Sequence, residues 1–272
     1  MSNLLKRSIT GTIYLTLLIG SILLGKYTFS ALFLAINVLA LFEFFNIIAN
    51  NKFFPNKYLG IAIGSALFIL AFVISSKMSN SRFYIFLIPL LILLFCAEIY
   101  RNKPYPFVNI AITILGIVYI SIPLSFLNYF VFPEIQQHKY TYEILLGYFI
   151  LIWTNDTSAY IFGMTLGKHK LFKRVSPEKT WEGFIGGAVV TIIVACILPG
   201  AFNILNRIDF IVLGIIVSIF GVAGDLAESL LKRSINLKDT GKILPGHGGI
   251  LDRIDSVLLT SPLIFGYLLV FK

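Results

Sequence analysis

The sequence predicts an all-α fold, a polytopic transmembrane helical bundle of about nine spans. Hydrophobic residues make up 57% of the 272 residues and charged residues only 13%, with a mean hydropathy of +0.88. Soluble domains carry about 25% charged residues, so this chain has too little charge to cover a soluble surface. The same apolar content excludes a disordered chain. The apolar runs are continuous, whereas the strands of a membrane β-barrel alternate polar and apolar residues.

Nine apolar segments each approach the ~20 residues that a helix needs to cross a bilayer. They cover residues 8–25, 27–49, 57–75, 83–100, 107–131, 143–166, 183–205, 210–231 and 249–271. The first segment follows Lys6 and Arg7, as the apolar part of a signal peptide would. No A-x-A-like cleavage site follows it and the second segment begins at once, so we expect a retained helix.

The first five segments contain few ionisable residues, and we expect region 1–140 to act as a transmembrane scaffold. The eighth and ninth segments each contain two acids, and charge is concentrated in the second half of the chain. We therefore expect region 141–272 to be catalytic, within one integral membrane unit. The two cysteines, Cys96 and Cys196, lie inside apolar runs. We expect both to be packing residues, because their spacing suits neither a disulfide framework nor a metal site.

The distribution of Lys and Arg predicts an N-in, C-out orientation, since cytoplasmic loops are enriched in these residues. With a cytoplasmic N-terminus, fifteen cations lie on the inside and six on the outside. The inside set is Lys6, Arg7, Lys52, Lys57, Arg101, Lys103, Lys168, Lys170, Lys173, Arg174, Lys179, Lys232, Arg233, Lys238 and Lys242. The outside set is Lys26, Lys77, Arg82, Lys139, Arg207 and Lys272. In a membrane protein the net charge of +9 fits anionic lipids or phosphate substrates better than nucleic acid.

Acids inside membrane segments are costly and are therefore functional candidates. They are Glu43, Glu98, Asp156, Asp225, Glu228, Asp252 and Asp255. In the predicted orientation nearly all lie in the cytoplasmic half of their segments, which predicts a polar cavity open to the cytoplasm. Two of them have plain structural alternatives: Glu98 could pair with Arg101, and Glu43 could bond to a neighbouring helix.

The spacing of the remaining acids predicts a site for a divalent cation. Asp225, Glu228, Ser229 and Lys232 share one helical face, because they stand at i, i+3, i+4 and i+7. Asp252, Asp255 and Ser256 repeat the pattern on the last segment. Facing helices with paired carboxylates would form a cage of hard oxygen ligands, which suits Mg²⁺. A structural alternative for Asp252 is an ion pair with Arg253 or Lys232.

The stretch 232–248 combines cations, glycines and a hydroxyl, a mixture that favours phosphate. Glycines allow close approach of the backbone, and N–H groups before a helix starting near Gly249 would favour an anion. Because carboxylates repel phosphate, a divalent metal would have to bridge the two.

At these residues the chain resembles the phosphatidate cytidylyltransferase, or CDP-diacylglycerol synthase, family in its bacterial-like form. The matching residues are Ser229, Lys232-Arg233, Lys238-Asp239, Gly241, Leu244-Pro245, His247-Gly248-Gly249 and Asp252-Arg253-Ile254-Asp255. A second match runs from Ser176 to Gly183 (Ser-Pro-Glu-Lys-Thr-Trp-Glu-Gly), and Asp156, Ala159-Tyr160, Gly163, Gly224-Asp225 and Glu228 also fit. The resemblance covers about residues 150–260.

The resemblance implies an Mg²⁺-dependent enzyme that converts CTP and phosphatidate to CDP-diacylglycerol and pyrophosphate in phospholipid biosynthesis. It implies catalytic roles for Asp225, Asp252, Lys232 and Lys238, and metal ligation by Asp225, Asp252, Asp255 and Glu228. Substrate contacts are expected from Ser176, Lys179, Thr180, Ser229, Arg233, Asp239, His247, Gly248, Gly249 and Arg253. Ser176 followed by Pro177 fits the cap and first position of a helix, a plain helix start being the alternative.

The resemblance also suggests a second cation, with K⁺ as the candidate. The expected partners are CTP, phosphatidate and membrane lipids, with a homodimer as a further expectation and no nucleic acid. The expected location is the cytoplasmic (inner) membrane, with the active site facing the cytoplasm. Two other functions remain open: a CTP-dependent enzyme acting on an ether lipid or an isoprenoid alcohol, and an ion-coupled transporter. Against the transporter, the sequence shows no paired interrupted helices in two repeats.

Overall fold

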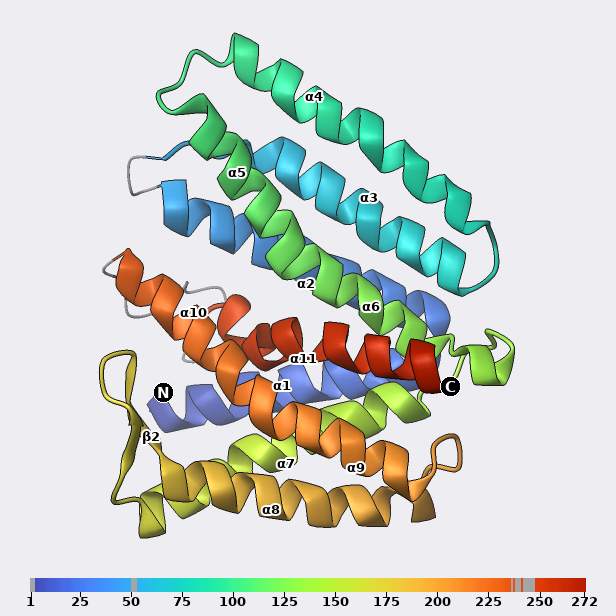
Figure 1. Ribbon diagram of the computed structural model, residues 1–272, viewed down its shortest axis with the longest axis vertical. Coiled ribbons are helices and arrows are strands. Elements are labelled where there is room, and N and C mark those ends of the chain that lie inside the picture. Colours follow the sequence, from blue (N-terminus) through green and yellow to red (C-terminus); the bar gives the residue numbers. More distant parts are fainter. Residues whose placement is uncertain (1–2, 50–52, 236, 238–240, 242–247) are drawn as a thin grey trace.

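The computed structural model describes the chain except for residues 1–2, 50–52, 236, 238–240 and 242–247, and it describes residues 3–9 by their backbone alone. Its elements form a bundle of roughly antiparallel helices with one small hairpin (Figure 1). The first half contains α1 (Asn3–Leu24), α2 (Lys26–Ala49), α3 (Lys57–Ser75), α4 (Leu87–Tyr100), α5 (Pro106–Gly116) and α6 (Ile122–Val131). The second half contains α7 (Glu143–Leu166), β1 (Lys170–Phe172), β2 (Ser176–Thr180), α8 (Trp181–Ile197), α9 (Arg207–Ile216), α10 (Val222–Ser234) and α11 (Leu251–Phe271).

These helices confirm the predicted all-α membrane fold. Within the described residues, seven helical stretches are long and apolar enough to cross a bilayer. The other two predicted segments correspond to α1, whose apolar part Thr10–Leu24 is shorter, and to α7, which carries the polar run 154–158. The number of spans and their orientation stay predictions.

Two of the long helices are interrupted by a π-helical turn, which the sequence pattern did not show. Ile117–Ser121 joins α5 to α6, and Val217–Gly221 joins α9 to α10. A π-turn shifts the register of the helix after it, and such turns occur often at functional sites. The second π-turn ends four residues before Asp225, and its Gly221 carbonyl accepts a hydrogen bond from Ser256 Oγ of α11 (3.4 Å). It therefore helps set how α10 and α11 pack.

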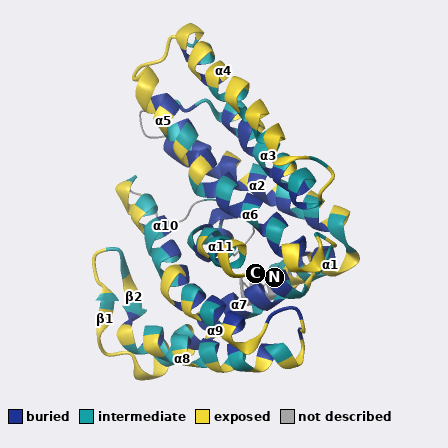
Figure 2. Cartoon of the chain, turned by 45° about the vertical axis from the view of Figure 1, so that its right-hand side comes forward, coloured by how far each residue is buried: buried dark blue, intermediate teal, exposed yellow. Residues whose placement is uncertain are grey.

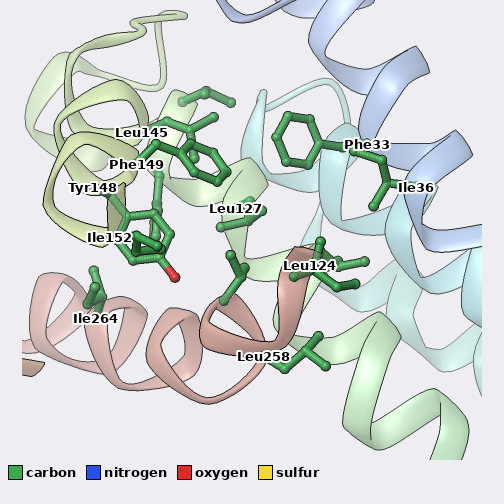
Figure 3. Close-up of a cluster of buried hydrophobic side chains, with 14 of the residues drawn as sticks. Phe33, Ile36, Leu124, Leu127, Leu145, Tyr148, Phe149, Ile152, Leu258 and Ile264 are labelled. Atoms are coloured by element: carbon green, nitrogen blue, oxygen red, sulfur yellow. The ribbon is translucent and has the colours of Figure 1, made fainter. Parts of the chain in front are cut away.

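One core joins both halves of the chain. Buried side chains from α2, α6, α7 and α11 meet there, among them Phe33, Leu127, Phe149 and Leu258 (Figure 3). Tyr148 of α7 and Thr260 of α11 also share a hydrogen bond between their hydroxyl groups. Since lipid is as apolar as these side chains, close packing and such hydrogen bonds stabilise the bundle more than the hydrophobic effect does.

Exposed side chains on the outer helices are largely apolar, as expected for a surface that contacts lipid (Figure 2). On α4, for example, Ile92 and Ile99 are exposed. Cys96 of the same helix is also exposed, so the expectation that it is a packing residue was wrong: its side chain lies on the outer face of α4. Cys96 and Cys196 are both free.

The β1–β2 hairpin is held against the start of α8. Glu182 of α8 accepts hydrogen bonds from the backbone N–H groups of Lys168 (3.1 Å) and His169 (3.2 Å), and His169 Nδ1 lies 2.6 Å from its Oε1. Lys170 pairs with Thr180 and Phe172 with Ser176 across the hairpin. The hairpin lies at the same end of the bundle as the N-terminus and the end of α10, and the C-terminus lies at the opposite end (Figure 1).

This arrangement leads to a first prediction, on sidedness. Single cysteines are introduced as Arg174→Cys in the hairpin and Lys139→Cys between α6 and α7, both exposed positions, in a chain whose Cys96 and Cys196 are replaced by Ala. If the hairpin is cytoplasmic, an impermeant thiol reagent should label intact cells at position 139 and leave position 174 unlabelled until the cells are opened. The reverse pattern would invert the proposed orientation.

Candidate active site

The packing of α7 on α8 positions one wall of the site. The two helices approach closely at small residues: a Cβ on Gly183 would lie 2.7 Å from the carbonyl oxygen of Ala159 and 3.1 Å from Cα of Gly163. Small residues permit this kind of contact between membrane helices. The contact gives Ala159, Gly163 and Gly183 a structural explanation, because it brings β2 and the start of α8 beside the C-terminal part of α7.

The expectation that Ser176 and Pro177 begin a helix was wrong. Residues Ser176–Thr180 form β2, and α8 begins at Trp181. Thr180 is the cap instead, its hydroxyl accepting a hydrogen bond from the N–H of Gly183 (3.2 Å). Both strands of a two-stranded sheet are edge strands, and edge strands tolerate proline. Pro177 therefore suits β2 as well as it would suit the first turn of a helix.

A cavity of about 480 Å³ lies between this wall and α10. Asn155, Asp156 and Tyr160 of α7 line it. Ser176, Lys179 and Thr180 of β2 line it as well, together with Asp225 of α10. The structure thus brings together three of the predicted substrate contacts from β2 and one predicted metal ligand from α10, two elements that are distant in the chain.

Three carboxylates converge beside this cavity. Asp225 and Glu228 of α10 and Asp255 of α11 each offer an oxygen within 4.8 Å of the others. Close approach of the helices makes this possible: a Cβ on Gly224 would collide with the backbone carbonyl of Asp255 and lie 3.3 Å from Cα of Ser256. The predicted shared face of α10 is confirmed, since Ser229 Oγ contacts Asp225 Oδ1 (3.4 Å) and Lys232 Nζ contacts Glu228 Oε2 (3.3 Å).

Two lysines balance the charge of the carboxylates. Lys179 of β2 lies 2.5 Å from Asp225 Oδ2. Lys232 lies between Glu228 and Asp252, with 2.6 Å from its Nζ to Asp252 Oδ1. The ion pair between Asp252 and Lys232 is the structural alternative weighed for this acid. Asp252 is outside the group of three converging carboxylates, and its role as a metal ligand stays a prediction.

The chemistry of the three carboxylates fits a divalent metal. All their donor atoms are hard oxygens, the set that Mg²⁺ prefers. Glu228 is buried, and its Oε1 has no hydrogen-bond partner within the part of the chain that the structure describes. A buried carboxylate oxygen without a partner is costly, and a cation would satisfy it.

At the start of α11, two backbone N–H groups that could bind an anion already donate hydrogen bonds to carboxylates of the protein. Gly249 donates its N–H to Asp252 Oδ2 (2.8 Å), so this group already has a partner. Gly248 precedes it with a φ of +82°, which glycine adopts readily. The N–H of Leu251 is bound by Glu43 Oε2 of α2 (2.9 Å). Glu43 therefore bonds to a neighbouring helix, which was its structural alternative, and no local pattern in the sequence points to that partner.

Several predicted residues lie elsewhere or outside the described part of the chain. Arg233 is exposed near the end of α10 and donates to the carbonyl of Leu237 (3.3 Å). Lys238, Asp239 and His247 lie outside the described residues. Glu98 pairs with Arg101 (2.7 Å) and accepts from Asn109 Nδ2 (2.9 Å), so its structural interpretation is confirmed.

Known proteins resemble this chain along almost its whole length. A model of the Cytidylyltransferase family matches residues 5–271. The phosphatidate cytidylyltransferase of Staphylococcus haemolyticus is 35% identical over 262 residues, which is 95% of this chain and 96% of the relative. That of Bacillus subtilis is 32% identical over 279 residues, 100% of both chains, and that of Staphylococcus aureus 42% identical over 166 residues, 60% of both.

Proposed function

Because the chain belongs to the cytidylyltransferase family, we propose that it joins CTP and phosphatidate to give CDP-diacylglycerol and pyrophosphate. The relatives that are similar over 95% and 100% of the chain are named phosphatidate cytidylyltransferase, after this activity. The observation that supports it most directly is the cluster of Asp225, Glu228 and Asp255, with Lys179 and Lys232 against it, beside a cavity between membrane helices.

The proposed chemistry requires charge neutralisation and positioning rather than an activated side chain. A phosphate oxygen of phosphatidate forms a bond to the α-phosphorus of CTP, while the bond from that phosphorus to the oxygen bridging to the β-phosphate breaks. The electron pair leaves with pyrophosphate. Because the lipid phosphate is itself the nucleophile, no Ser or Cys needs to be deprotonated. Fixed cations around the phosphates then supply much of the stabilisation.

The residues in and beside the cavity have corresponding roles. Asp225, Glu228 and Asp255 would hold Mg²⁺, which when bound would neutralise phosphate charge and polarise the α-phosphoryl group. Lys179 and Lys232 would orient phosphate oxygens as point charges, and Ser176 and Thr180 would add hydroxyl donors. Asp252 keeps Lys232 in place. The second cation, K⁺, is part of the proposal on resemblance alone.

The setting of the reaction completes the proposal. The enzyme is an integral membrane protein, and we place it in the cytoplasmic (inner) membrane with the cavity facing the cytoplasm, where CTP is found. The excess of cations in the segments at the hairpin end supports this orientation. A homodimer is part of the proposal as well.

A turnover assay with labelled CTP tests the function and its metal. Purified protein in detergent should transfer label from α-³²P-CTP into a lipid product when phosphatidate and Mg²⁺ are present, release pyrophosphate, and stop when EDTA removes the metal. An alcohol kinase would instead transfer the γ-phosphoryl group, so only γ-³²P-CTP would label its lipid. Full activity after exhaustive chelation would contradict the metal site, and ion uptake into proteoliposomes without any CTP turnover would favour the transporter.

A further inference from the structure

A second cavity, of about 380 Å³, adjoins the first along α7. Tyr14 and Leu15 of α1, Trp153 of α7 and Arg253 of α11 are among the residues that line it. Leu15 is 40% exposed on the outer surface of the bundle. The cavity therefore has an apolar and aromatic part that reaches the outer surface. The rest of its lining includes the hydroxyl groups of Thr10 and Thr157 and the opposite charges of Asp156 and Arg253.

We propose that this second cavity holds phosphatidate, with its phosphate at Arg253 and its acyl chains passing beside α1 into the bilayer. The inference rests on the proposed function and adds which of the two cavities takes the lipid. Arg253 lies in the first turn of α11 and is exposed, so its charge is accessible to a ligand. Its planar guanidinium group can bind two phosphate oxygens at once, which a lysine cannot do.

Asp156 connects the two cavities. Its side chain lines both of them, and it lies within electrostatic reach of Lys179 in the first and of Arg253 in the second. One carboxylate thus has a cation on each side, and each cation faces a different cavity. Two phosphate groups, one bound in each cavity, would therefore lie close to each other beside Asp156.

The division of the two substrates follows from the chemistry of the walls. The first cavity contains hydroxyl groups, Lys179 and Asp225, which is one of the three carboxylates that fit a metal, and this lining suits the triphosphate of a nucleotide. The second combines Arg253 with Leu15, Tyr14 and Trp153, which suits a phosphomonoester attached to acyl chains. The first helix would then form part of the lipid site, although the sequence indicated only a scaffold role for it.

Kinetics of two variants separate lipid binding from nucleotide binding. Arg253→Gln removes the guanidinium group, and Gly11→Leu adds bulk to the wall that α1 contributes to the cavity. Each should raise the KM for phosphatidate and leave the KM for CTP within about twofold. For Arg253→Gln we expect a rise of at least about tenfold, the scale of losing one charge-assisted hydrogen bond. Gly20→Leu is the matched control on α1, since a Cβ there meets nothing within 4 Å, and it should behave as wild type.

Photolabelling gives a readout that does not require turnover. A phosphatidate carrying a diazirine near the glycerol should label peptides of α1 and α7 in the wild-type protein without CTP, and Gly11→Leu should lose most of that label. A raised KM for CTP with an unchanged KM for phosphatidate in Arg253→Gln would assign the cavity to the nucleotide and overturn the proposal. Turnover without labelling of α1 would also overturn it, whereas labelling of α1 without any turnover would refute the proposed function and leave the lipid site standing.

Discussion

Asp225→Asn and Asp255→Asn are each expected to lower kcat by at least about 10²-fold, the scale of removing one key electrostatic stabiliser. Both changes keep the size and hydrogen-bonding capacity of the side chain and remove one negative charge from the cluster of three carboxylates. If the two residues act through one cation, the double variant should be little worse than either single variant. Steady-state turnover of correctly inserted protein measures kcat.

Binding of Mn²⁺, followed by electron paramagnetic resonance in the absence of substrates, separates metal loss from other defects. Affinity should fall in Asp225→Asn and Asp255→Asn. Glu98→Gln is the control, a buried carboxylate of α4 that pairs with Arg101 and lies outside the cluster, and it should keep kcat within a few-fold. Near-normal turnover in both aspartate variants, with turnover abolished in Glu98→Gln, would show that the active site has been misplaced.

The helical ranges and the shared face of α10 could be predicted because both depend on local periodicity. Runs of about 20 apolar residues fix where helices form, and positions i, i+3, i+4 and i+7 fix which side chains of one helix meet. The contacts of Ser229 and Lys232 with Asp225 and Glu228 followed from that spacing alone.

Contacts between segments distant in the chain could not be predicted, because they depend on which helices become neighbours. Lys179 reaches Asp225 only because α7 and α8 pack closely and carry β2 toward α10. Glu43 reaches the N–H of Leu251 across the boundary between the expected scaffold and catalytic regions. No pattern in the sequence identifies either partner.

Local sequence patterns also gave wrong or incomplete predictions where the same residues are compatible with two different structures. Ser176-Pro177 suits a helix start as well as an edge strand. It forms a strand here because β2 pairs with β1. The π-turn at Val217–Gly221 leaves the apolar pattern of the helix unbroken, so hydropathy could not reveal it. Both features bear on the site, since one carries Lys179 and the other precedes Asp225.

Gly224→Ala is expected to reduce kcat by about 10²-fold, although the change adds one methyl group and touches no substrate. The new Cβ would collide with the carbonyl of Asp255, a backbone atom that cannot rotate away, so α10 and α11 must separate or shift. A displacement of about 1 Å between catalytic groups is enough for a loss of this size. Added bulk at a packed contact should also lower the free energy of unfolding by about 1–3 kcal/mol.

Gly266→Ala on α11 is the matched control, because a Cβ there meets nothing within 4 Å. It should retain wild-type kcat and thermal stability. Thermal unfolding in detergent and Mn²⁺ affinity, measured beside turnover, distinguish a shifted site from a misfolded protein: Gly224→Ala should remain folded, bind Mn²⁺ more weakly and turn over slowly. If Gly224→Ala keeps kcat within a few-fold and binds Mn²⁺ normally, the carboxylates of α10 and α11 do not act as one site, and the close approach of these helices is not what creates it.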